Sequence, residues 1–91
     1  MSHDKALDTA EKIFEILATP TYPDSQKAYS CIAFLEYAPP EFFDEYPREC
    51  KAIVAGAFEY GAGWKQVADA ASIDIAEAKR RWADVAMPST R

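Results

Sequence analysis

Residues 63–85 read GWKQVADAASIDIAEAKRRWADV, and this stretch decides the fold. Its apolar residues recur at helical spacing on both sides of a short break, which predicts one helix over about Trp64–Ala71 and a second over about Asp74–Val85. Asp74 suits the start of the second helix, because an aspartate side chain accepts hydrogen bonds from N–H groups of the first turn. Ser72 and Ile73 then form a tight connection, in which the isoleucine is expected to plug the angle between two crossing helices.

This pair of short helices resembles the helix-turn-helix of small bacterial and phage DNA-binding proteins. The resemblance covers about residues 50–85: a glycine-containing turn over residues 60–63 precedes a helix that opens with tryptophan, and the pair Arg81-Trp82 ends the next helix. Such turns usually carry glycine, whereas this chain has Ser72 there. A serine fits if the turn is less left-handed, or at a small cost in strain. Residues 1–49 resemble no family.

The resemblance implies that the second helix enters the major groove of double-stranded DNA, with its first residues facing the base edges. Carried over to this chain, Lys65 and Gln66 would contact phosphates, and Lys79 and Arg80 would pair with guanine or phosphate. The full set of expected DNA-binding residues is Lys65, Gln66, Ile75, Lys79, Arg80 and Arg81.

The residues that would face the bases are poorly suited to binding DNA tightly, because Asp74 and Glu77 add negative charge and the Ala76 side chain forms no hydrogen bond. Four basic residues at most would meet phosphates, fewer than the roughly 6–10 contacts of a strongly salt-dependent specific binder. A monomer is therefore expected to bind weakly, and a homodimer would double the contacts. DNA binding also predicts a positive patch with no carboxylate in its middle.

The rest of the chain reads as further helices separated by prolines. The first expected helix ends before residues 19–23, and the second runs from Asp24 or Ser25 to about Tyr37. A short helical turn over residues 41–46 follows. A third long helix is expected from Pro47 to about Tyr60, with Gly61 as its left-handed cap. No strand is predicted. The sequence thus predicts a single all-α domain of about five helices, with an N-terminal helical part over residues 1–46 and a helix-turn-helix part over residues 47–86.

The apolar spacing also predicts which side chains face inward. In the second helix these are Ala28, Tyr29, Ile32 and Leu35, joined by Cys31, Phe34 and Tyr37; in the third they are Cys50, Ile53, Val54, Ala57 and Phe58. In the last two helices they are Trp64, Val67, Ala68 and Ala71, and then Ile75 or Ala78 with Trp82 and Val85.

An alternative site is an aromatic surface before the third long helix. Phe42 and Phe43 are adjacent, so they are not expected to face inward together on one helix. An exposed aromatic among Phe42, Phe43 and Tyr46 would favour a protein partner, since aromatic residues are enriched in interfaces. The neighbouring acidic residues, which include Glu41 and Asp44, would suit a basic partner.

The charge is unevenly distributed along the chain. Residues 1–50 carry four basic and ten acidic side chains, whereas residues 51–91 carry six basic and five acidic ones, within a total of −5. The acidic first half repels nucleic-acid phosphates. Two alternatives to DNA binding therefore stay open: a protein-binding helical module, such as a phage-type inhibitor or adaptor of a host protein, and an acidic DNA mimic.

The residue inventory argues against an enzyme and against a bound cofactor or metal. His3 is the only histidine, and no Cys-x-x-Cys pair or glycine-rich phosphate loop is present. Cys31 and Cys50 are expected to be small core residues with free thiols. No apolar run approaches the ~18 residues of a membrane span, and the first residues lack a signal-peptide pattern, so we expect a cytoplasmic protein.

Overall fold

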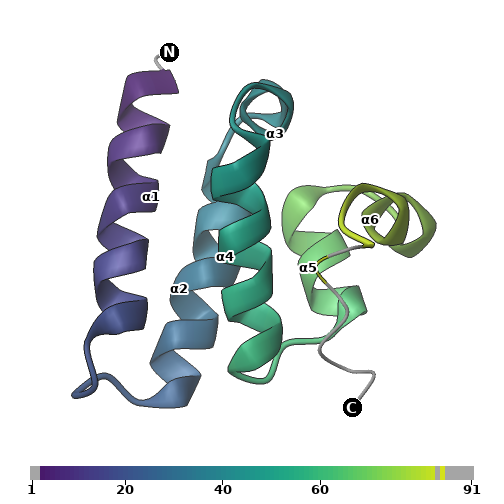
Figure 1. Ribbon diagram of the computed structural model, residues 1–91. Helices are drawn as coiled ribbons and strands as arrows, with labels where there is room; N and C mark the ends of the chain where they lie inside the picture. The colour runs from purple at the N-terminus through teal and green to yellow at the C-terminus, as the bar shows by residue number, and fades with distance from the viewer. Residues whose placement is uncertain (1–2, 84, 86–91) are drawn as a thin grey trace.

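The chain folds entirely as α-helices in the part that the structure describes. The computed structural model describes residues 3–83 and residue 85 (Figure 1). These residues form α1 (His3–Ala18), α2 (Asp24–Tyr37), α3 (Pro40–Glu45), α4 (Pro47–Glu59), α5 (Trp64–Ala71) and α6 (Ile75–Arg81). The predicted all-α class is confirmed, and the expected short turn before α4 is a helix in its own right. Ala86, the predicted end of the helix-turn-helix part, lies outside the described residues.

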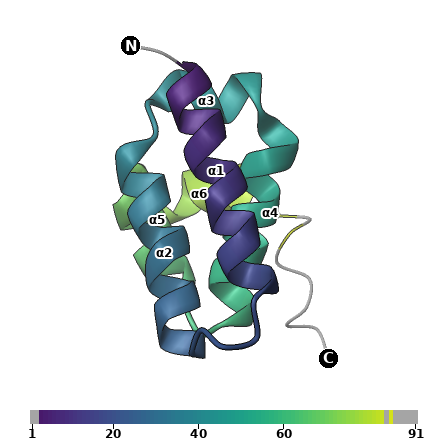
Figure 2. The same ribbon diagram turned by 90° about the vertical axis from the view of Figure 1, so that its left-hand side faces the viewer.

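Three long helices form the body of the molecule. Helix α2 runs opposite to α1 and α4 and packs against both of them as well as against α5 (Figure 1). Turned by 90°, the molecule has α1 in front of α2 and α4, and α5 and α6 lie behind them (Figure 2). The last two helices therefore form the face of the protein that is farthest from α1. Among the described residues, no helix is both long and apolar enough to cross a membrane.

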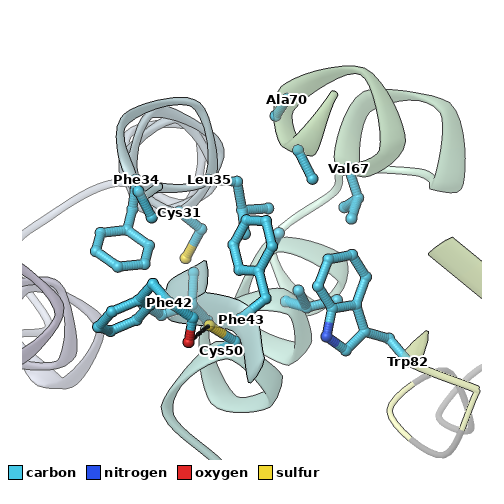
Figure 3. Close-up of a cluster of buried hydrophobic side chains, with 14 of the residues drawn as sticks. Cys31, Phe34, Leu35, Phe42, Phe43, Cys50, Val67, Ala70 and Trp82 are labelled. Carbon is cyan, nitrogen blue, oxygen red and sulfur yellow. Dashed lines mark hydrogen bonds between the residues drawn. The ribbon is translucent and has the colours of Figure 1, made fainter. Parts of the chain in front are cut away.

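The core lies where α2, α3, α4 and α5 meet. Its largest fully buried side chains are Cys31, Phe34, Leu35, Phe42, Cys50, Ile53, Val54 and Val67. Phe34 of α2 meets Phe42 of α3 edge-on, with the ring centroids 5.6 Å apart (Figure 3). On the other side of α3, Phe43 meets Trp82 at 5.8 Å in the same manner. These contacts tie α3 to the long helices and to the end of α6.

The prediction that Phe42 and Phe43 would not both face inward is wrong. Phe42 is fully buried and Phe43 is 7% exposed. Helix α3 lies between the α2–α4 core and Trp82, so two of its sides are covered, and the adjacent rings point to different neighbours (Figure 3). Tyr46 is half-buried, with its ring centroid 4.8 Å from that of Phe42.

The inward face of α2 also differs from the predicted one. Tyr29 is 71% exposed and Tyr37 is 51% exposed, although both were expected in the core. Cys31, Phe34 and Leu35 take the buried positions, as expected. Lys27 is buried too, with its ammonium 5.0 Å from the centre of the Tyr60 ring, where a cation is attracted to the π-face.

Proline and glycine, rather than polar capping side chains, mark the two helix ends at which α2 begins and α4 stops. Pro23, rather than Asp24 or Ser25, is the N-cap of α2, and no side chain caps this end. Gly61 follows α4 with a φ of 116°, as the sequence predicts. The Ala62 N–H donates to the Ala57 carbonyl at 2.8 Å, which closes the helix end around that glycine.

Candidate nucleic-acid interface

Helix α5 begins at a well-anchored tryptophan. The Trp64 ring packs edge-on against Phe58 of α4, with the centroids 4.8 Å apart. Gly63 is the N-cap, and its N–H donates to the Gln66 Oε1 at 3.0 Å. Gln66, whose side chain also carries an NH₂ donor, and its neighbour Lys65 are both exposed. The start of α5 thus presents two hydrogen-bond donors on a fixed backbone.

The connection between α5 and α6 is as tight as the sequence predicts. Ser72 adopts the left-handed conformation, with φ 63° and ψ 38°. The Ile73 N–H donates to the Ala68 carbonyl at 3.0 Å, and the Ser72 N–H donates to the Asp69 carbonyl at 3.1 Å. Ile73 packs against the core, in agreement with its predicted role as a plug. The two helices therefore diverge directly from a closed turn.

Helix α6 keeps one side on the core and the other in solvent. The Asp74 Oδ1 accepts the Glu77 N–H at 2.8 Å, which confirms the predicted cap. Ala78 and Trp82 are buried, whereas Ile75, Ala76, Lys79 and Arg80 are exposed. Ala76 and Arg80 lie opposite Ala78, while Ile75, three residues before Ala78, lies at the edge of the side that packs on the core. The helix ends at Arg81 rather than near Val85, because Trp82 leaves helical geometry where its ring packs against Phe43.

A carboxylate lies among the basic residues of α6. Arg80 Nη2 contacts both carboxylate oxygens of Glu77, at 2.7 and 2.6 Å, and Arg81 Nε reaches the same side chain at 3.1 Å. Arg81 Nη1 also contacts the Asp44 Oδ1 of α3 at 3.3 Å. The hydrogen bond from Arg80 lowers the pKa of Glu77, and the same pair raises the pKa of Arg80.

The expectation of a positive patch without a carboxylate in its middle is therefore wrong. Glu77 lies one turn before Arg80 and Arg81, at a spacing that brings side chains together on a helix. Lys65 is paired as well, with Asp69 at 3.1 Å. Of the four basic residues predicted to bind DNA, Lys79 alone forms no ion pair within the described part of the chain.

The alternative aromatic surface does not form where the sequence placed it. Phe42 and Phe43 are buried and Tyr46 is half-buried, so they offer no exposed aromatic patch. Instead, the exposed aromatic side chains are Tyr22, Tyr29 and Tyr37, which lie on α2 or just before it. Sequence reasoning missed these tyrosines as candidates because the apolar spacing placed Tyr29 and Tyr37 inward.

Among the described residues, no group of three His, Cys, Asp or Glu side chains could hold a metal ion. Cys31 and Cys50 are buried free thiols. Burial raises the pKa of each of them to about 12, so they carry no thiolate near neutral pH.

Comparison with known proteins gives no match to a family model, to a curated protein or to a solved structure.

Proposed function

We propose that this protein binds double-stranded DNA by docking the exposed side of α6 in the major groove, as a small cytoplasmic regulator or accessory protein of bacterial or phage type. The observation that carries the proposal is the two-sided character of α6. Ala78 and Trp82 hold it to the core, while Lys79 and Arg80 are exposed. Helix α6 itself lies on the face of the molecule farthest from α1 (Figure 2). Its resemblance to the helix-turn-helix supports the same use.

The side chains divide into contacting and positioning roles. Lys79 and Arg80 would contact guanine edges or phosphates. Lys65 and the Gln66 amide NH₂ would bind the phosphate backbone beside them. Arg81 is half-buried and bridges Glu77 to Asp44, so we assign it to holding α6 against α3 rather than to the DNA.

The ion pairs around Glu77 weaken DNA binding without preventing it. The Arg80 side chain is 71% exposed and that of Glu77 is 29% exposed, so water reaches their pair. Pairs that water reaches contribute little to stability, because water screens them and fixing long side chains costs entropy. A phosphate oxygen can therefore replace Glu77 as the partner of Arg80. We expect weak binding by one molecule, strong dependence on salt, and tighter binding by a homodimer that presents two copies of α6.

The test is a DNA-binding titration by fluorescence anisotropy at about 50 mM salt, where phosphate contacts are strong. The double substitution Lys79→Ala and Arg80→Ala is expected to weaken binding at least about tenfold. The matched control is Lys5→Ala with Lys12→Ala, which removes the same charge from exposed positions on α1. Absence of DNA binding by the unchanged protein, or an equal loss in the α1 control, would overturn the proposal.

A protein-binding module is the second candidate, because α2 exposes aromatic side chains. Tyr29 and Tyr37 are eight residues apart, so they lie on neighbouring parts of the same outer face, and tyrosine is enriched in protein interfaces. This function predicts that Tyr29→Ser with Tyr37→Ser abolishes binding of a protein partner, while the Lys79 and Arg80 variant keeps it.

The acidic DNA mimic stays a prediction. Asp44, one of the carboxylates that such a mimic would present, is paired with Arg81.

A further inference from the structure

We propose that Ile75 and Ala76 recognise the 5-methyl groups of two adjacent thymines in the major groove. This inference rests on the proposed DNA binding and adds the chemical class of base that α6 reads.

The starting observation is an isoleucine in an unusual place. Ile75 is 40% exposed, and it is the one large aliphatic side chain exposed to this degree in the described part of the chain. Its neighbours pack against the core: Ile73 at the turn, and Ala78 and Trp82 on the buried side of α6. Ile75 is partly covered at the edge of the packed side of α6, yet 40% of its surface stays in solvent, and a complex that covers this remainder would gain hydrophobic burial.

Ala76 extends this apolar surface by one residue and is also exposed. Neither side chain donates or accepts a hydrogen bond, so neither can satisfy the polar major-groove edges of guanine, cytosine or adenine. Thymine alone presents a methyl group in the major groove, and apolar side chains are its usual partners. An apolar pair at the first two positions of a groove-docked helix thus selects thymine.

Charge around the pair fits a DNA partner rather than an apolar protein. Lys79 follows Ile75 by four residues and Arg80 follows Ala76 by four, so each apolar side chain has a cation beside it, about 6 Å further along the same face. Glu77 is turned toward Arg80 and Arg81. One oxygen of the Asp74 carboxylate accepts a hydrogen bond from the α6 backbone. Anionic phosphates on either side of the groove complement Lys79 and Arg80, while the methyl groups between them complement Ile75 and Ala76.

The experiment selects the preferred duplex from a random pool at about 50 mM salt and then replaces its thymines with uracil, which removes only the methyl group. We expect the affinity to fall about fourfold per contacted methyl group and about 15-fold for two. Ile75→Ser is expected to bind the thymine and uracil duplexes almost equally. Because Ile75 is exposed, this variant should stay folded, which circular dichroism can verify.

Tyr29→Ser is the matched control, since it removes an exposed apolar ring from α2 and should keep the full preference for thymine. Equal binding of the thymine and uracil duplexes by the unchanged protein would overturn the inference and leave DNA binding intact. Retained preference in Ile75→Ser would overturn it as well. Absence of binding to every duplex would overturn both the inference and the proposed function.

Discussion

Ser72 is the one non-glycine residue with a positive φ in the described chain, and it marks the turn on which α6 depends. A side chain in this conformation crowds the following carbonyl, at a cost of about 1–2 kcal/mol that glycine avoids. Ser72→Gly is therefore expected to raise the free energy of unfolding by about 1 kcal/mol, after allowing for the greater freedom of glycine in the unfolded chain. Urea denaturation followed by circular dichroism measures this change.

The control for this prediction is Ser30→Gly in the middle of α2. There glycine should lower the free energy of unfolding by about 0.5 kcal/mol, because it is a poorer helix former than serine. A loss of stability in Ser72→Gly similar to that in Ser30→Gly would contradict the strain at the turn.

Cys31 and Cys50 predict how stability depends on alkaline pH. Burial raises the pKa of each thiol from 9.0 to about 12, so the folded chain keeps protons that the unfolded chain releases. The unfolded state binds fewer protons above pH 9, and the free energy of unfolding therefore falls as the pH rises from about 9 toward 12, by at most about 1.4 kcal/mol per pH unit for each thiol. Urea denaturation of Cys31→Ala should show a flatter decline than the unchanged protein. Equal slopes for the two proteins would contradict the prediction.

At the scale of elements, α2 and α3 show where sequence periodicity is insufficient. Periodicity identifies one apolar stripe, but α2 packs against α1, α4 and α5, so its buried surface is broad and its orientation depends on all three neighbours. Tyr29 was misplaced for this reason. Phe42 packs against Phe34, and Phe43 packs against Trp82, which is distant in the sequence, so a local pattern could not show that the second ring is covered.

In the candidate nucleic-acid interface, the backbone conformation could be predicted from the sequence better than the ion pairs could. The Asp74 cap, the turn at Ser72 and the plug at Ile73 depend on neighbours within a few residues, and sequence reasoning placed all three. The contact between Arg81 and Asp44 joins residues 37 positions apart, so only the tertiary structure could reveal it. The pairing of Glu77 with Arg80 could have been found from their spacing of three residues.

Glu77 gives the prediction that belongs to α6 as an element. Glu77→Gln removes the carboxylate that holds Arg80 and leaves Lys79, Arg80 and Arg81 without an anion of their own helix beside them. DNA affinity at low salt is expected to rise about three- to tenfold, because an added positive charge strengthens phosphate binding. Anisotropy titrations provide the measurement.

The control is Glu15→Gln on α1, which changes the net charge equally and should have a smaller effect on DNA affinity. A fall in affinity for Glu77→Gln would show that Glu77 helps to hold α6 in its binding position.

At the scale of the molecule, charge and shape are aligned. The acidic first half of the sequence forms α1, α2 and α3, whereas α5 and α6 lie behind the long helices when α1 is in front (Figure 2). Lys65 and Asp69 balance each other in α5, and α6 carries three basic residues against one carboxylate, Glu77. A polyanion approaching this protein is repelled by the acidic helices and attracted to α6. In the proposed DNA complex, this asymmetry confines phosphate contacts to the face formed by α5 and α6.

The salt dependence of DNA binding tests this arrangement. Lys65, Lys79 and Arg80 are the exposed cations of the interface, so three phosphate contacts per molecule predict a slope of log affinity against log salt of about −3 for a monomer and about −5 for a dimer. Sedimentation measurements on the complex establish which stoichiometry applies. Lys79→Ala should reduce the magnitude of the slope by about one for a monomer and by about two for a dimer, whereas Lys12→Ala on α1 should leave it unchanged. A slope near zero would mean that phosphates do not drive the association, and the exposed tyrosines of α2 would then be the surface to investigate.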